Sequence, residues 1–373
     1  MSSSAADLPS DEVYLSFDPS GITDKPFRDS LSAIVEDPRS RAGRRLLWTA
    51  SDEHRSVQLL HSSNGKSFQQ IASIDLARCF GLKGEKEIDL EGLAFDEHQR
   101  LWMVGSHALV RKDRKKNTGP EELLERLREV EPASNRNSGE TNRLLLGYLN
   151  VEISGDSHTE INVVKHASLP IAGIDNALTK ELRDDPLLAN FLTIPSKDNG
   201  FDIEGIAVYG DRVFLGLRGP VLRGWAFIVE IEVKEDDDAL ALKRIGRNGE
   251  RYWLHPLYLN GLGTRDLCAQ GNDMLVLAGP TMSLDGPAAI YRWRNPRDAR
   301  ISPNESNLFP QFVGGVPCGK DCDRPEGMTL LDWGTAGERP SVMVVYDKPD
   351  ESKRCKSDQA VVADIFTLGD LPK

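Results

Sequence analysis

A short acidic motif recurs along this chain and constrains its fold more than any other feature. The motif reads Asp-Leu-Glu-Gly-Leu at 89–93, Asp-Ile-Glu-Gly-Ile at 202–206 and Arg-Pro-Glu-Gly-Met at 324–328. Each copy opens a short apolar run, which a polar turn joins to a second apolar run. Weaker copies of the same plan occupy 28–50 and 264–278. Two apolar runs joined by a turn are typical of a β-hairpin, so the motif marks a repeated hairpin.

Further strand-like runs complete each repeat. Four strands per unit, at a spacing of roughly 60 residues, are typical of the blades of a β-propeller. The interval between the first two copies is about twice as long, and helical patterns near 117–140 and 174–195 account for the excess. We therefore expect an all-β fold with one propeller over 25–370. Five blades fit best, and six are the alternative if the long interval hides a degenerate blade.

The N-terminal tail has a place in this plan. Residues 1–24 precede the first repeat and contain a strand pattern at 13–17. A propeller protects its sheet edges by closing into a ring. We expect the 13–17 strand to complete the last blade and so close the ring.

The repeated motif also predicts where a site lies. In a propeller the first strand of each blade lines the central channel, so its opening residues share one rim, and the antiparallel second strand ends at the same rim. First strands would bring Glu91, Glu204, Asp266 and Glu326 around one mouth, with Arg265 and Arg324 beside them. Returning strands would add Asp52, His107, Arg218 and Asp347. The alternative is that duplicated blades keep the Glu-Gly pair for blade geometry alone.

Charge repulsion constrains such a ring. Two carboxylates about 6 Å apart, at an effective dielectric of about 20, repel by about 3 kcal/mol. The ring therefore needs a cation, neighbouring arginines or bound protons. Oxygen ligands without a matching His or Cys set favour Ca²⁺, with Mg²⁺ or Mn²⁺ as alternatives, and the candidate ligands are Glu91, Glu204, Asp266 and Glu326. Arg265 and Arg324 are able to balance the charge instead.

The motif copies carry a family resemblance. The repeated Asp-x-Glu-Gly-[Leu/Ile] is similar to the strand-opening motif of esterase-like phytases and to the gluconolactonase and regucalcin-like propellers. The three Glu-Gly copies, with their spacing over about 25–370, most resemble a bacterial β-propeller family of unknown function. The phytase resemblance implies metal-assisted hydrolysis of phosphomonoesters in the channel mouth. It would make Glu91, Glu204 and Glu326 the metal or acid–base carboxylates.

Two functions of different classes follow. One is a metal-assisted hydrolase of a small anionic ester, a phosphoester or a lactone, in which a divalent cation at the carboxylate ring polarises the substrate and activates water. In it Glu91, Glu204, Glu326 and His107 are catalytic. Arg218, Arg265 and Arg324 would bind the anion. The alternative is a non-catalytic propeller that binds a small ligand or a protein. No motif for a nucleotide or an organic cofactor occurs.

Composition and sequence patterns argue against several other classes of protein. A net charge of −12 argues against binding nucleic acid. No stretch reaches the about 18 apolar residues of a membrane helix, and the N-terminus lacks the basic and apolar regions of a secretory signal. Five cysteines are few and odd in number, which favours a reducing, cytoplasmic location. Cys318 and Cys322 are read as plain thiols, with a redox pair or metal clip as the alternative.

Overall fold

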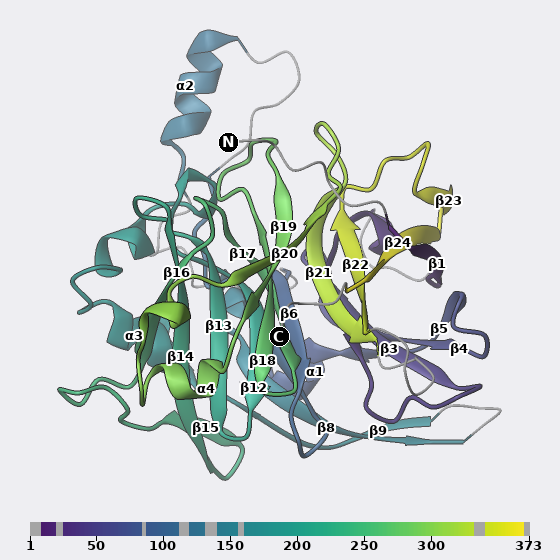
Figure 1. Ribbon diagram of the computed structural model, residues 1–373, viewed down its shortest axis with the longest axis horizontal. Helices are drawn as coiled ribbons and strands as arrows, with labels where there is room; N and C mark the ends of the chain where they lie inside the picture. The colour runs from purple at the N-terminus through teal and green to yellow at the C-terminus, as the bar shows by residue number, and fades with distance from the viewer. Residues whose placement is uncertain are drawn as a thin grey trace.

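The computed structural model describes residues 9–19, 25–83, 87–111, 119–130, 140–155, 160–331 and 340–368. Strands dominate it (Figure 1). The helices are short: α1 (Leu76–Phe80), α2 (Pro120–Arg128), α3 (Ala177–Leu182) and α4 (Pro296–Ala299). Helices α2 and α3 lie within the two expected helical insertions. Residues 117–118 and 131–139 of the first insertion lie outside the described residues. No helix among the described residues is both long and apolar enough to span a membrane.

Antiparallel pairing arranges the strands in five successive groups. The first two groups are β2 (Leu31–Glu36), β3 (Arg45–Ser51), β4 (Ser56–Ser62) and β5 (Ser67–Asp75), then β6 (Leu90–Phe95), β7 (Arg100–Gly105), β8 (Leu146–Ser154) and β9 (Glu160–Ser168). The third is β12 (Asp202–Tyr209), β13 (Arg212–Gly219), β14 (Trp225–Asp236) and β16 (Trp253–Tyr258). The last two are β17 (Gly263–Gln270), β18 (Asp273–Gly279), β19 (Ala288–Trp293) and β20 (Gln311–Val316), then β21 (Arg324–Leu331), β22 (Ser341–Asp347) and β24 (Ala360–Thr367), with β23 (Cys355–Ser357) on its edge.

Two parallel contacts join four of these groups into larger sheets. Strand β1 (Asp11–Ser16) pairs antiparallel with β24 and parallel with β5, so it lies between the last group and the first (Figure 1). Strand β15 (Ala239–Leu242) continues from β14 and meets β9 in parallel. The strands therefore form two nine-stranded sheets and one of four, besides the small ribbon of β10 (Ile171–Ala172) and β11 (Asp175–Asn176). Strand pairing therefore gives fewer separate sheets than the five blades expected from the sequence. The fold is all-β and propeller-like.

The first strands of the five groups contact one another in cyclic order: β2, β6, β12, β17, β21 and again β2. Glycine permits this close approach. A Cβ on Gly205 would lie 2.8 Å from the Cα of Asp266 on the next strand, and a Cβ on Gly327 would lie 3.0 Å from the Cα of Ala33. The first separation is shorter than real Cβ contacts, and the second is tighter than most of them. The glycine that follows each motif glutamate therefore has a structural role.

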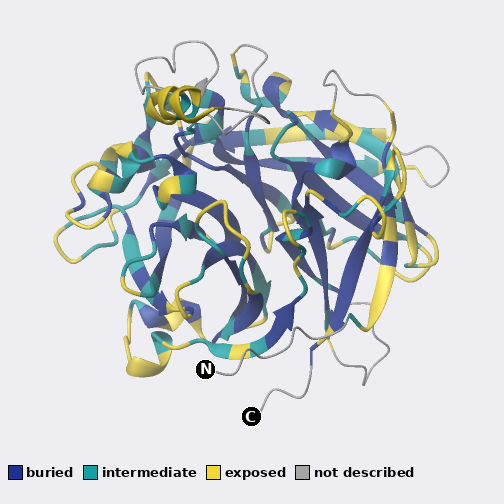
Figure 2. Ribbon diagram, turned by 90° about the horizontal axis from the view of Figure 1, so that it is seen from above, coloured by how far each residue is buried: buried dark blue, intermediate teal, exposed yellow. Residues whose placement is uncertain are grey.

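The apolar core follows the same cyclic order. Five clusters of buried apolar residues each lie between two neighbouring strand groups. Trp48 and Met103 belong to the cluster between the first and second groups, and Phe214 and Trp293 to the cluster between the third and fourth. Viewed from above, the buried strands surround the middle of the molecule and exposed residues lie mainly in the loops (Figure 2). Burial of each Leu, Val or Phe contributes about 1.5–3 kcal/mol, so these clusters hold the strands in place around the centre.

Candidate functional site in the central cavity

Each of the five first strands has an irregular register at the same place. The pairing of β6 with β7 shifts between Leu90 and Gly92, which leaves Glu91 outside the ladder. Corresponding shifts occur in β2, β12, β17 and β21. A β-bulge of this kind adds one residue and redirects its side chain. The five bulged residues are Ser32, Glu91, Glu204, Arg265 and Glu326.

This register corrects the expectation for Asp266. The bulged residue of β17 is Arg265, and Asp266 occupies the position that Gly92 and Gly327 hold in other groups. A shift of one residue in a strand turns a side chain to the opposite face. Asp266 is 1% exposed and does not line the cavity. Its carboxylate accepts hydrogen bonds from the backbone N–H groups of Leu267 (2.7 Å) and Met328 (2.6 Å), so it joins β17 to β21.

The other bulged charges line one central cavity of about 350 Å³. Ten carboxyl-bearing side chains and eight lysines or arginines surround it, including Glu91, Glu204, Arg265 and Glu326. Arg218, Arg324, Asp52 and Asp347 also line it, as expected for the ends of neighbouring strands, and Cys318 and Cys322 lie at its wall as free thiols. The cavity is therefore nearly balanced in charge, whereas the sequence predicted a predominantly acidic ring.

Two arginines account for much of this balance. Arg218 places Nη1 2.5 Å from Glu204 Oε1 and Nη2 2.6 Å from Asp202 Oδ2. Arg265 places Nη1 3.0 Å from Glu204 Oε2 and also pairs with Glu326. A continuous chain of ion pairs therefore crosses the cavity from β12 to β21. Both arginines are engaged with protein carboxylates, so neither guanidinium is left over for a ligand anion.

A third pair was not predicted. Arg143, in the 3-10 helix η3 (Glu140–Leu144), places Nη1 3.0 Å from Asp89 Oδ2. Asp89 opens the first repeat and was expected near the rim. Arg143 lies in the long insertion between strands of the second group, outside the repeated motif, so no sequence signal pointed to it.

Glu91, Asp52 and Asp347 lack such partners among the residues that the structure describes. Glu91 and Asp347 are only 9% and 8% exposed, and neither side chain has a hydrogen bond or ion pair within the described part of the chain. Asp52 Oδ1 is buried and also without a hydrogen-bond partner there. Burial and then Glu204 raise the pKa of Glu91 well above its usual range. Burial and then Glu326 raise the pKa of Asp347 to about 7, while burial and then Asp347 raise that of Asp52.

Arg324 differs from Arg218 and Arg265. It is the strand partner of Asp347 in the pairing of β21 with β22. Its guanidinium makes no ion pair with any of the residues that the structure describes. Arg324 is therefore the guanidinium among Arg218, Arg265 and Arg324 that is able to meet a ligand.

His107 lies away from the cavity, contrary to expectation. It is 2% exposed, with Nδ1 2.8 Å from the carbonyl oxygen of Gly105 and Nε2 2.7 Å from Nδ2 of Asn176. A carbonyl oxygen only accepts, so Nδ1 carries the hydrogen, and Nε2 accepts from the amide. Asn176 also caps helix α3. The neutral imidazole thus attaches the α3 insertion to the end of β7.

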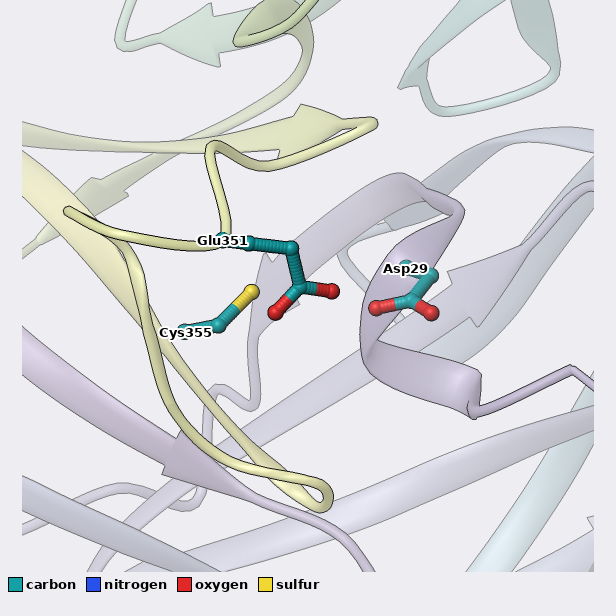
Figure 3. Close-up of side chains that lie close together, drawn as sticks. All are labelled: Asp29, Glu351 and Cys355. Carbon is teal, nitrogen blue, oxygen red and sulfur yellow. The ribbon is translucent and has the colours of Figure 1, made fainter.

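The predicted metal ligands do not converge. Among the described residues, one group of His, Cys, Asp or Glu brings three ligand atoms within 4.8 Å of one another, and it is Asp29, Glu351 and Cys355 (Figure 3). Arg28 already supplies positive charge there, with Nη1 3.1 Å from Asp29 Oδ1 and Nη2 3.4 Å from Glu351 Oε1. The set of Glu91, Glu204, Asp266 and Glu326 forms no such group.

Fold and site together define an all-β, propeller-like protein with a charged central cavity. The chain belongs to the family described as "Protein of unknown function (DUF3616)", whose model matches residues 31–364. This agrees with the expected family of unknown function. No curated protein matches the chain.

Several solved structures are distantly similar. A hypothetical protein from Leishmania major has a TM-score of 0.41 and 10% identity, over 96% of this chain and 90% of that one. An exo-β-1,3-galactanase from Clostridium thermocellum has a TM-score of 0.40 and 9% identity, over 94% of this chain and 62% of that one. A GH43 β-1,3-galactosidase has a TM-score of 0.37 and 8% identity, over 92% of this chain and 94% of that one. Nothing about the activity of this chain follows from similarities of this size.

Proposed function

We propose that the chain is a five-bladed propeller whose central cavity hydrolyses a small anionic ester. Three features support five blades: five strand groups, five first strands in cyclic contact, and five apolar clusters between groups. The long interval after Glu91 contains β10, β11 and α3 among its described elements, and these do not make a further four-stranded group.

The observation that carries the hydrolase proposal is the pair of Asp347 and Arg324. Asp347 is a buried carboxyl group without a hydrogen-bond partner in the described part of the chain, and burial raises its pKa to about 7. A general base works best when its pKa lies near the working pH. Arg324, its strand partner, is available to bind the anionic group of a substrate.

These two residues define a simple reaction. The Asp347 carboxylate takes a proton from a water molecule as the water oxygen attacks the ester. The carbon–oxygen or phosphorus–oxygen bond to the leaving group then breaks, and protonated Asp347 returns the proton to the leaving alkoxide. Arg324 stabilises the negative charge that builds up on the substrate. Arg218 and Arg265 act as positioning residues, because they hold Glu204 and Glu326 through ion pairs.

The donor set favours this scheme over a metal-dependent one. A bound Ca²⁺ takes oxygen ligands at 2.3–2.6 Å, so its ligands lie within about 5 Å of one another. Glu204 and Glu326 already have arginine partners, and Asp266 is bonded to backbone N–H groups. The carboxylates expected to bind Ca²⁺ therefore do not fit a shared ion.

A panel of phosphate monoesters and lactones, tested with EDTA and with added CaCl₂, checks the proposal. We expect turnover in EDTA and a loss of about 100-fold or more in Asp347→Asn. Asp358→Asn is the matched control, because Asp358 is exposed in the turn between β23 and β24. Turnover that needs CaCl₂ and survives in Asp347→Asn would refute the scheme. Ligand binding without any turnover would favour the non-catalytic alternative.

A further inference from the structure

Glu91 is the bulged carboxylate that the ion-pair chain leaves out. Glu204 and Glu326 occupy equivalent positions on β12 and β21, and each has an arginine partner. Glu91 lines the same cavity, is more than nine-tenths buried and has no hydrogen bond or ion pair within the described residues. The Arg218 guanidinium interacts electrostatically with Glu91, but its Nη atoms are both engaged with Glu204 and Asp202.

The neighbours of Glu91 add negative charge. The charges that act on it most strongly are those of Glu204, Asp89, Glu326 and Asp52. The first three have arginine partners. Among the described residues Asp52 has none, and its buried Oδ1 atom has no hydrogen-bond partner there. Lys25, at the cavity wall, pairs with the neighbouring Glu53, and its charge also acts more weakly on Asp52. A buried carboxylate without a partner is costly, so Glu91 takes up a proton more readily than usual, and a positive group from outside the protein would stabilise its ionised form.

We infer that the cavity binds its ligand through a cationic nitrogen that lies between Glu91 and Asp52. This inference deepens the proposed function and rests on it, since it takes the substrate to be a small ester that also carries an ammonium group. The ammonium group would meet the carboxyl side of the cavity, on the first and second strand groups. The anionic group would meet Arg324 on the fifth.

The spacing of the carboxylates favours an ammonium group over a bare metal ion. Glu91 and Asp52 belong to no group of three ligand atoms within 4.8 Å of one another among the described residues. An ammonium nitrogen donates hydrogen bonds of about 2.8 Å in several directions and so reaches oxygens that lie farther apart. An alkyl chain next to the nitrogen would find Val110 and Pro280 on the cavity wall.

Calorimetric titration with three probes of similar length tests the inference. The probes are 1,4-diaminobutane, 4-aminobutan-1-ol and 1,4-butanediol, which carry two, one and no positive charges at neutral pH. We expect both amines to bind and the diol not to bind. Glu91→Gln keeps the side-chain volume and removes the charge, and it should weaken amine binding by about tenfold or more.

Glu97→Gln is the matched control, because Glu97 is 68% exposed at the opposite end of the same β6–β7 hairpin. It should leave amine binding unchanged. Equal binding of amine and diol, or no amine binding at millimolar concentration, would overturn the inference. So would CaCl₂ binding that displaces the amines and is lost in Glu91→Gln, since the site would then be a metal site. Turnover is measured separately: turnover without amine binding refutes this inference alone, and amine binding without turnover refutes the hydrolase alone.

Discussion

Arg265 is the residue whose removal should disturb the cavity most. Its guanidinium lies between Glu204, at 3.0 Å, and Glu326, and it is 6% exposed. At an effective dielectric of about 20, one such contact is worth about 5 kcal/mol before desolvation is subtracted. Breaking a buried ion pair by removing one partner costs about 3–5 kcal/mol, because a charge is left buried and unpaired. We expect Arg265→Met to lower the free energy of unfolding by about this amount at pH 7.5.

A double-mutant cycle identifies the cause. Urea unfolding, followed by tryptophan fluorescence, is measured for Arg265→Met, Glu326→Gln and the double variant. Glu326 loses its arginine partner when Arg265 is replaced, whereas Glu204 keeps Arg218. Removing the charge of Glu326 should therefore restore more than half of the lost stability. If the double variant is no more stable than Arg265→Met, buried charge is not the reason for the loss, and our account of the ion-pair chain is wrong.

Three further predictions concern the ring and its surroundings. Gly205→Ala should destabilise the fold by about 1–3 kcal/mol in urea unfolding, because the added Cβ would lie 2.8 Å from the Cα of Asp266; an unchanged stability would show that the first strands are able to move apart. His107→Gln should lower stability by about 1–3 kcal/mol and leave the pH profile of turnover unchanged, since its ring contacts Gly105 and Asn176 and not the cavity. Asp347 has a pKa raised to about 7 in the folded state, so its contribution to stability is complete below about pH 4 and is lost as the pH rises towards 7. The stability of Asp347→Asn should therefore fall less over that range, and a parallel pH dependence in variant and wild type would contradict the assignment.

The repeated motif predicted the all-β, propeller-like fold because the same residues serve both packing and the site. Glycine after Glu91, Glu204 and Glu326 permits close contact between first strands, and the glutamate before it points into the cavity. A pattern that is required by both packing and the site recurs in the sequence. The cavity location could therefore be predicted from the chain alone, together with Asp52 and Asp347 at the ends of returning strands.

The assignment of Asp266 was wrong for a physical reason. Matching acid to acid aligned Asp266 with Glu91, whereas matching the bulge aligns Arg265 with it. A bulge changes register by one residue, and nothing in the composition of the 264–267 segment marks which residue leaves the ladder. Strand β17 has an arginine where β6, β12 and β21 have a glutamate, and this arginine pairs with Glu204 on β12 and Glu326 on β21.

Contacts between distant segments account for the other errors. His107 is 69 residues from Asn176, its partner in a helical insertion. Arg143 likewise reaches Asp89 from outside the repeat. Sequence periodicity reports on local structure and on repeated contacts, but these contacts occur once. A polar residue at a strand end faces the cavity unless an insertion supplies it with a partner elsewhere, as Asn176 does for His107.

The bulges have a consequence for how such a protein can change. A bulged residue makes no ladder pairing of its own, so its side chain is replaceable without altering which backbone atoms bond across the sheet. Serine, glutamate and arginine already occupy this position in different strands of one chain, at Ser32, Glu91 and Arg265. Four of the five bulged side chains, those of Glu91, Glu204, Arg265 and Glu326, line the cavity, so changes at these positions alter its charge while the scaffold stays the same. Saturation mutagenesis at these positions would be a compact route to new ligand preferences.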